Sequence, residues 1–190
     1  MTDWPAIVSR HSGAVWQTAY RLLGNHAEAA DCYQETFLAA LEISRRQNVR
    51  NWCALLTRLA TCRAVDGLRR RARHAARHDD LADWATVSSP NPGPAELAES
   101  AELSARLRVS LAELPPKQAE VFCLRYLSGL SYRQIARQIG MRTSAVGVLL
   151  HRARSRLREM LSTSASAAAA GETDPSRLAA GETEDSEVRQ

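Results

Sequence analysis

The chain has 190 residues, 45% of them hydrophobic, so it can bury the core of one ordinary domain or of two small ones. Aromatic residues are scarce, at 5%, whereas alanine, leucine and arginine are abundant, and this composition favours helices over a sheet. The formal net charge is +4, but the segment after Leu161 holds six acidic residues and two arginines, so the first 161 residues carry +8. A basic body of this kind suits a polyanionic partner, or is simply an arginine-rich surface.

Helical periodicity dominates the chain up to about residue 73. Asp3 can cap a first helix, which Gly24 ends, and Asn25 opens a second helix with a capping pattern. A third helix is expected from near Asn51, and it runs into the basic stretch RRRARHAARH, which begins at Arg69. We assign residues 1–78 to one small helical domain.

Composition changes over residues 79–100, which include the segment PNPGP. Proline at this density blocks helical hydrogen bonding, so we predict a flexible linker there. Helical periodicity returns over 101–161, the expected second domain. Residues 162–190 contain too few large apolar side chains to offset chain entropy and are predicted to form a disordered acidic tail. The predicted fold class is all-α: two small helical domains joined by a flexible linker, the second a helix-turn-helix domain, with a disordered C-terminal tail.

The segment SYRQIARQIGMRTSAVGVLLHRARSR, from Ser131, has the spacing of a helix-turn-helix. Ala136 allows close approach of a second helix, Gly140 can adopt a positive φ in the turn, and Val146 fills the crossing point. We call these three residues the helix-turn-helix frame. A second helix held in this way can enter a DNA major groove, although an ordinary helical hairpin with a basic surface has a similar pattern. The residues expected to contact DNA are Arg142, Thr143, Ser144, Gly147, His151, Arg152 and Arg154.

Two further helix faces carry polar patterns. Asp31, Gln34, Glu35 and Leu38 follow i, i+3, i+4, i+7 spacing; this acidic stripe is either a solvated face or a surface for a protein partner. In the third helix, cationic residues from Arg63 to Arg73 suit a nucleic-acid backbone, but they equally suit the solvated C-terminal end of a helix.

The sequence gives little reason to expect an enzyme, a metal site or a cofactor. His74 and His78 are spaced like a zinc pair beside Asp79 and Asp80, yet no further ligand is spaced to close the site. The four cysteines contain no C-x-x-C pair, and no common nucleotide-binding or hydrolase motif occurs. Because no apolar run approaches the length of a membrane span, we expect a cytoplasmic protein without membrane insertion.

Two parts of the chain together resemble the extracytoplasmic-function (ECF) group of sigma-70-type RNA polymerase sigma factors. The first part contains YRLLGNHAEAADCYQETFLAAL and LLTRLATCRAVDGLRRR, and the second contains LAELPPKQAEVFCLRYLSGLSYRQIARQIGMRTSAVGVLLHRARSRLREML. They resemble regions 2 and 4 of that family in order, spacing and length. A match of two regions is more specific than a single helix-turn-helix.

The resemblance implies a role for each surface. The acidic stripe, Asp31, Gln34, Glu35 and Leu38, would dock on the clamp coiled coil of the β′ subunit of core RNA polymerase. The helix-turn-helix would read the promoter −35 element. The residues implied for recognition and opening of the −10 element are Arg63, Asp66, Arg69, Arg70 and Arg73. An anti-sigma protein is a further partner of many such factors.

The chain departs from the family pattern at several positions. Ala30 precedes the acidic stripe where an acidic residue is common, and Leu55 and Cys62 replace a tryptophan and an asparagine of many −10 helices. Gly147 and Leu149 stand where the recognition helix often has basic residues. Two other hypotheses therefore remain: a free-standing helix-turn-helix regulator that does not bind RNA polymerase, and an interaction protein that has lost promoter binding.

Overall fold

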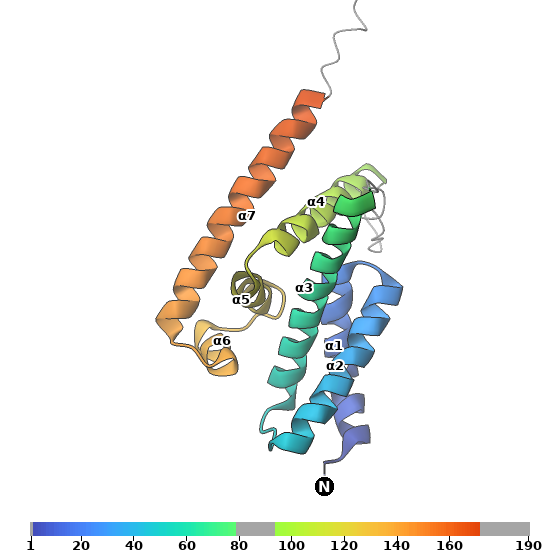
Figure 1. The fold of residues 1–190 in the computed structure, drawn as a ribbon, viewed down its shortest axis with the longest axis vertical. Helices are drawn as coiled ribbons and strands as arrows, with labels where there is room; N and C mark the ends of the chain where they lie inside the picture. The colour runs from blue at the N-terminus through green and yellow to red at the C-terminus, as the bar shows by residue number, and fades with distance from the viewer. Residues whose placement is uncertain (1, 79–93, 172–190) are drawn as a thin grey trace, which may run out of the picture.

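The structure is a computed structural model that describes residues 2–78 and 94–171. Within these residues it contains seven α-helices and no strand, so the predicted all-α class is confirmed for them. Figure 1 shows α3 at the centre, with α1 and α2 on one side of it, α4 and α5 on the other, and the long α7 along the outer edge.

The first three helices are α1 (Trp4–Leu23), α2 (His26–Arg46) and α3 (Trp52–His78). Each begins where a short polar side chain accepts a backbone hydrogen bond: Asp3 from the amide of Ala6 at 3.1 Å, Asn25 from Glu28 at 3.1 Å, and Asn51 from Ala54 at 3.0 Å. The predicted starts of the three helices are therefore confirmed. One core cluster of this bundle consists of the buried residues Val15, Ala40, Leu56 and Ala60. Trp4 and Trp52, the first residues of α1 and α3, pack against it with their rings edge to face.

The remaining helices are α4 (Pro94–Glu113), α5 (Pro116–Tyr126), α6 (Tyr132–Ile139) and α7 (Thr143–Gly171). Pro115 and Pro116 separate α4 from α5, because a proline inside a helix removes a hydrogen bond and clashes with the preceding turn. A second core cluster joins α5, α6 and α7; its buried members are Val121, Leu124, Ile135, Ala136, Val146 and Leu150.

A third core cluster is shared between the two halves of the chain. It includes Leu22 and Leu68 from the first half, and Leu111, Cys123 and Leu157 from the second. The N-terminal bundle and the helix-turn-helix portion are thus packed against each other through α3, and this contact was not anticipated from the sequence.

Two segments are more helical than the sequence suggested. The start of α4, Pro94, lies inside the segment 79–100 that we predicted to be a linker; residues 79–93 lie outside the described residues. Helix α7 continues to Gly171 and so includes the first part of the predicted tail, 162–190, of which 172–190 lie outside the described residues. The alanine-rich stretch after Ser162 explains the extension, because alanine has the highest helix propensity and needs no packing partner to favour a helix.

Candidate functional site

The helix-turn-helix frame has the predicted geometry. Gly140 ends α6 with φ 69° and ψ 38°, and its N–H donates to the carbonyl of Ala136. The amide of Met141 donates to the same carbonyl at 2.9 Å, so the two bonds close the turn. Val146 is fully buried and Ala136 nearly so, at the contact between α6 and α7. The turn therefore fixes the angle at which α7 leaves α6.

Helix α6 also begins as predicted. The hydroxyl of Ser131 accepts from the amide of Gln134 at 3.3 Å, and the Gln134 side chain accepts from the amide of Ser131 at 2.8 Å. This reciprocal capping box satisfies two N–H groups that the first turn leaves without a partner. A helix of only eight residues is stabilised in this way at the position where it must support α7.

The outer side of α7 carries the residues predicted to contact DNA. Six of the seven are exposed: Arg142, Thr143, Ser144, His151, Arg152 and Arg154. Gly147 is half-buried, and the ring of Tyr132 lies beside it: a Cβ built on this glycine would be 3.9 Å from Cε2 of Tyr132. Val148, which is 50% exposed, adds an apolar side chain to the surface of this helix. The structure thus brings the predicted residues together on α7 and at Arg142, which directly precedes it, and the first residues of the helix are exposed. Their contact with DNA remains a prediction.

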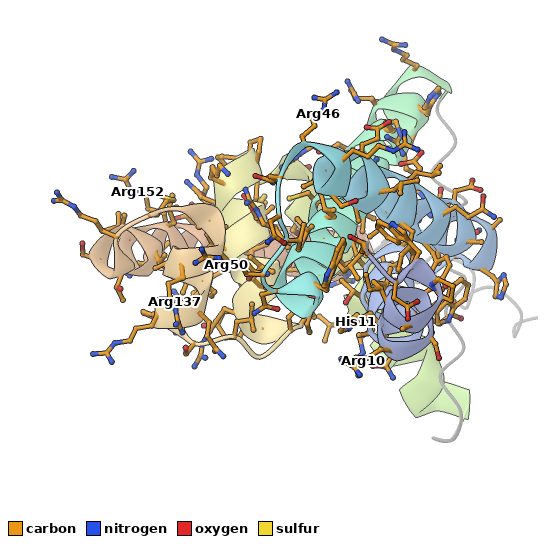
Figure 2. The ribbon with its side chains drawn as sticks, turned by 90° about the horizontal axis from the view of Figure 1, so that it is seen from below. Arg10, His11, Arg46, Arg50, Arg137 and Arg152 are labelled. Atoms are coloured by element: carbon orange, nitrogen blue, oxygen red, sulfur yellow. The ribbon has the colours of Figure 1, made fainter. Side chains whose placement is uncertain are left out.

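Additional arginines beside this helix were missed by the sequence reasoning. Arg133 and Arg137 of α6 are exposed, and with Arg142 and Thr143 they line an open hollow of about 640 Å³. Figure 2 shows Arg137 and Arg152 projecting from this end of the molecule. Because Arg133 and Arg137 are four residues apart on α6, their i, i+4 spacing was a signal that could have identified them.

The segment that joins α2 to α3 is a second basic surface absent from the prediction. Arg45 and Arg46, in the last turn of α2, and Arg50, in the segment that follows, are exposed. Figure 2 shows Arg46, Arg50, Arg137 and Arg152 in one view. A hollow of about 410 Å³ lies at this segment, lined in part by Arg45, Arg46 and Trp52. Three arginines within RRQNVR were the available signal. Cations on both halves of the chain are compatible with one polyanion reaching both.

The acidic stripe lies along α2. Asp31 and Gln34 are exposed, and Leu38 is exposed over 62% of its area, which is unusual for a leucine. Glu35 is half-buried because its carboxylate accepts from Nη1 of Arg63 at 2.9 Å. The stripe is therefore accessible, but one of its acids is held by a residue predicted to belong to the −10 surface.

The five −10 residues of α3 do not share one free face. Arg70 and Arg73 are exposed, and Asp66 pairs with Arg69 at 3.1 Å. Arg69 also donates from Nε to the carbonyl of Ala112 at 3.3 Å and from Nη2 to that of Leu114 at 2.8 Å, so it faces the second half of the chain. Arg63 faces α2 instead. Helical spacing alone could not distinguish these partners.

Three of the four cysteines are wholly or partly buried, whereas Cys53 is exposed. In residues 2–78 and 94–171 no group of three or more histidine, cysteine or acidic side chains is placed to hold a metal ion. Burial raises the pKa of the Cys32 thiol to about 11 and that of the Cys123 thiol to about 12. Burial, with the nearby Glu120 carboxylate, also raises the pKa of Cys62 to about 12. Such thiols carry almost no reactive thiolate near neutral pH.

No helix in the described part of the chain is long and apolar enough to cross a membrane. The fold and its surfaces instead define an all-helical protein of the helix-turn-helix class, with basic surfaces on both halves and an accessible acidic stripe on α2.

Comparison with known proteins places the chain within that class. The family model for sigma-70 region 2 matches residues 7–74, and the model for sigma-70 region 4 matches residues 104–157. Together the matches cover well over half of the chain, in the order that the resemblance indicated. The chain belongs to the sigma-70 family, and the curated relatives that it resembles are ECF sigma factors.

Two curated relatives illustrate the similarity. The chain is 32% identical over 162 residues to the ECF RNA polymerase sigma factor SigE of Mycolicibacterium smegmatis, a match that covers 85% of this chain and 62% of the relative. It is 28% identical over 162 residues to the ECF RNA polymerase sigma factor SigW of Bacillus subtilis, covering 82% of this chain and 87% of the relative. The chain thus spans less than two thirds of the first relative and most of the second.

Solved structures support the fold. The sigma factor RpoE from Bartonella quintana, in complex with the anti-sigma factor NepR, superposes with a TM-score of 0.52 at 22% identity, covering 85% of this chain and 98% of that one. CnrH, in complex with the cytosolic domain of CnrY, gives a TM-score of 0.51 at 22% identity, covering 84% and 87%. At this identity the likeness concerns the fold.

Proposed function

We propose that this protein is an alternative sigma factor, which binds core RNA polymerase and directs it to promoters through their −10 and −35 elements. The observation that carries the proposal is the presence of both sigma regions in one chain, region 2 over 7–74 and region 4 over 104–157. A sigma factor needs both, because one region must contact the polymerase and the −10 element while the other reaches the −35 element. No covalent step is required of the protein itself.

In this proposal the −35 element is read by α7. Arg142, Thr143 and Ser144 lie at its exposed N-terminal end, where a recognition helix meets base edges. Arg152 and Arg154 lie further along the exposed side and would neutralise phosphates. With glycine at 147, specificity depends mainly on the first turn of the helix.

The polymerase would bind the acidic stripe of α2. Asp31, Gln34 and Leu38 offer an accessible surface with an acidic and an apolar end, which suits the clamp coiled coil of the β′ subunit and does not suit DNA. Residues of α3, among them Arg70 and Arg73, would then contact the −10 region. We further propose that residues 1–78 and 101–161 act as separate domains during initiation, that the protein works in the cytoplasm, and that an anti-sigma protein regulates it.

Reconstitution with core RNA polymerase tests the function. The expected result is that the purified chain co-elutes with core enzyme, and that the holoenzyme makes transcripts from a set of genomic promoters that core enzyme alone does not use. Sequence-specific DNA binding in the absence of any association with core enzyme would refute the sigma-factor proposal and favour the free-standing regulator.

The docking surface is tested by charge reversal. Asp31→Arg should weaken binding to core enzyme because it replaces an exposed acid of the acidic stripe with a cation. The matched control is the same reversal at the exposed Glu159, which belongs to α7. Helices α7 and α2 lie on opposite sides of the molecule in Figure 1. Equal binding by D31R and the unaltered chain would rule out this stripe as the docking surface.

A further inference from the structure

The outer side of α7 has an apolar residue at its centre. An α-helix has about 3.6 residues per turn, so side chains at i, i+4 and i+7 share one side of it. The side that packs inward carries the buried residues Val146, Leu150, Ala153 and Leu157. The opposite side carries Ser144, Val148 and His151, which are exposed and which we call the outer stripe. Val148 stands in the middle of this stripe and is 50% exposed.

Two pairs of arginines flank the outer stripe. Arg152 and Arg156 lie along one flank, and Arg154 and Arg158 lie along the other, each pair at i, i+4 spacing. All four side chains are exposed. A helix in a DNA major groove lies between two phosphate backbones, so cations on both flanks suit that position. The outer stripe between the two pairs is then the part of α7 that faces the base edges.

The residue that precedes Val148 adds no polar side chain to this surface. Gly147 has no side chain, and a Cβ built there would be 3.9 Å from Cε2 of Tyr132. The ring of Tyr132 is therefore the nearest group on that side; the residue is 40% exposed, and Cζ of Arg125 lies 5.6 Å from the ring centroid. Position 147 thus offers a base neither a hydrogen-bond donor nor a cation beside Val148.

The chemistry of valine restricts which base can lie against it. Its side chain ends in two methyl groups, which neither donate nor accept a hydrogen bond. In the major groove only thymine presents an apolar group, its C5-methyl, whereas guanine, adenine and cytosine present donors or acceptors. Covering one of those polar edges with Val148 would leave it without a hydrogen-bond partner, which is unfavourable. Covering the thymine methyl removes apolar surface from water, which is favourable.

We propose that Val148 is a base-reading residue of α7 and selects a thymine in the −35 element through the C5-methyl group of that base. The assignment to the −35 element rests on the proposed function. The contact extends base reading beyond the first turn of α7, where Thr143 and Ser144 lie, to its second turn. It also fixes the orientation of the base pair, because the reversed pair would present the polar edge of adenine at the same place.

The first measurement compares thymine with uracil, which differ only in the C5-methyl group. The preferred duplex is first selected from a random-sequence library, by the full chain alone and by the chain bound to core RNA polymerase. Each thymine of that duplex is then replaced singly by uracil, and affinity is measured by fluorescence anisotropy. We expect one replacement to weaken binding by about fourfold, the effect of exposing one buried methyl-sized group. Equal affinities for thymine and uracil at every position would overturn the proposal.

The second measurement assigns the effect to Val148. Val148→Ala shortens an exposed side chain within a helix, so the fold should be retained, which circular dichroism would verify. We expect V148A to bind the thymine duplex about as weakly as the wild-type chain binds the uracil duplex, and to bind the two duplexes equally. The matched control is Leu103→Ala, which shortens a side chain of α4 that is 60% exposed, and it should keep the fourfold difference. A difference that persists in V148A would overturn the assignment.

Association with core polymerase, measured on the same preparations, separates this proposal from the proposed function. A thymine–uracil difference that disappears in V148A, in a chain that does not associate with core enzyme, would support thymine reading and refute the sigma-factor function. A chain that forms an active holoenzyme but binds thymine and uracil duplexes equally would overturn thymine reading and leave the function supported. Selection of no preferred sequence, by the chain alone or by the holoenzyme, would also overturn thymine reading.

Discussion

Replacing Gly140 by alanine tests the turn that positions α7. The glycine has φ 69°, and no atom lies within 4 Å of a Cβ built there, so the substitution introduces backbone strain without a steric clash. A left-handed backbone conformation at a residue with a side chain destabilises the folded state by about 1–2 kcal/mol relative to glycine. The lower conformational entropy of the unfolded alanine variant offsets this by about 0.4–1 kcal/mol. We expect a net loss of about 1 kcal/mol, which for a chain of this size lowers Tm by about 2–4 °C.

Gly147→Ala is the matched control, because the chemical change is identical but the position is helical. Glycine in a helix interior is about 1 kcal/mol less favourable than alanine. The added Cβ would make an ordinary contact with Tyr132 at 3.9 Å. G147A should therefore stabilise the protein while G140A destabilises it. Urea unfolding followed by circular dichroism measures both, and equal shifts of the two midpoints in the same direction would refute the assignment of Gly140 to a strained turn.

The remaining predictions concern chemistry at single side chains. With intact wild-type protein at neutral pH, an alkylating reagent should modify the exposed Cys53 rapidly and Cys62 far more slowly, because burial and the Glu120 carboxylate raise the pKa of Cys62 to about 12. Mass spectrometry of the labelled peptides measures the two rates, and equal rates would contradict this prediction. Burial disfavours the charged form of Glu120, but hydrogen bonds from Lys117 and Arg58 outweigh it and hold the folded-state pKa of this carboxyl below its ordinary value of 4.5. The contribution of Glu120 to stability is therefore fully present above that value and is lost as the pH falls through the lowered pKa. The unfolding free energy of E120Q should accordingly fall less steeply below pH 4.5 than that of the wild-type chain. An equal pH dependence of the unfolding free energy in the two proteins below pH 4.5 would contradict the lowered pKa of Glu120. Arg152→Ala should weaken DNA binding about equally for different sequences and reduce the slope of log affinity against log salt concentration by about one, as expected for a lost phosphate contact. Arg21→Ala on α1 is the control and should change neither quantity. A loss of affinity confined to one base position would assign Arg152 to base readout instead.

Much of the local structure follows from short-range patterns. Asp3, Asn25 and Ser131 cap helices because a short polar side chain meets the free N–H groups only three residues along the chain. The helix-turn-helix frame is equally local, since one glycine at a positive φ and two small or branched residues define the crossing of two adjacent helices. The predictions based on these patterns were correct for that reason. Composition was a weaker guide at the segment boundaries, where α4 and α7 extend into stretches that we had assigned to the linker and the tail.

The arrangement of charges was decided by tertiary packing. The sequence could place Glu35 and Arg63 on neighbouring helices, but not show that they would pair, and it grouped Arg69 with DNA-facing residues although its partners are carbonyls of α4. These contacts join residues separated by 28 to 45 positions in the chain. Periodicity says which side of a helix a residue occupies, and it carries no information on which other helix will cover that side.

The sequence by itself determined that this protein is helical and where most of its helices begin, because caps, turns and apolar spacing act over a few residues. Its two sigma-type regions were indicated by resemblance to a known family. Only the tertiary structure decided that the two regions share a core, and that Arg58, Arg69 and Arg108 hold helix ends and a buried carboxylate across the contact. The physical reason is that an arginine has the same local pattern whether it is solvated, bound to phosphate or inserted into a helix end, and the choice depends on the distant groups that folding brings within hydrogen-bond distance.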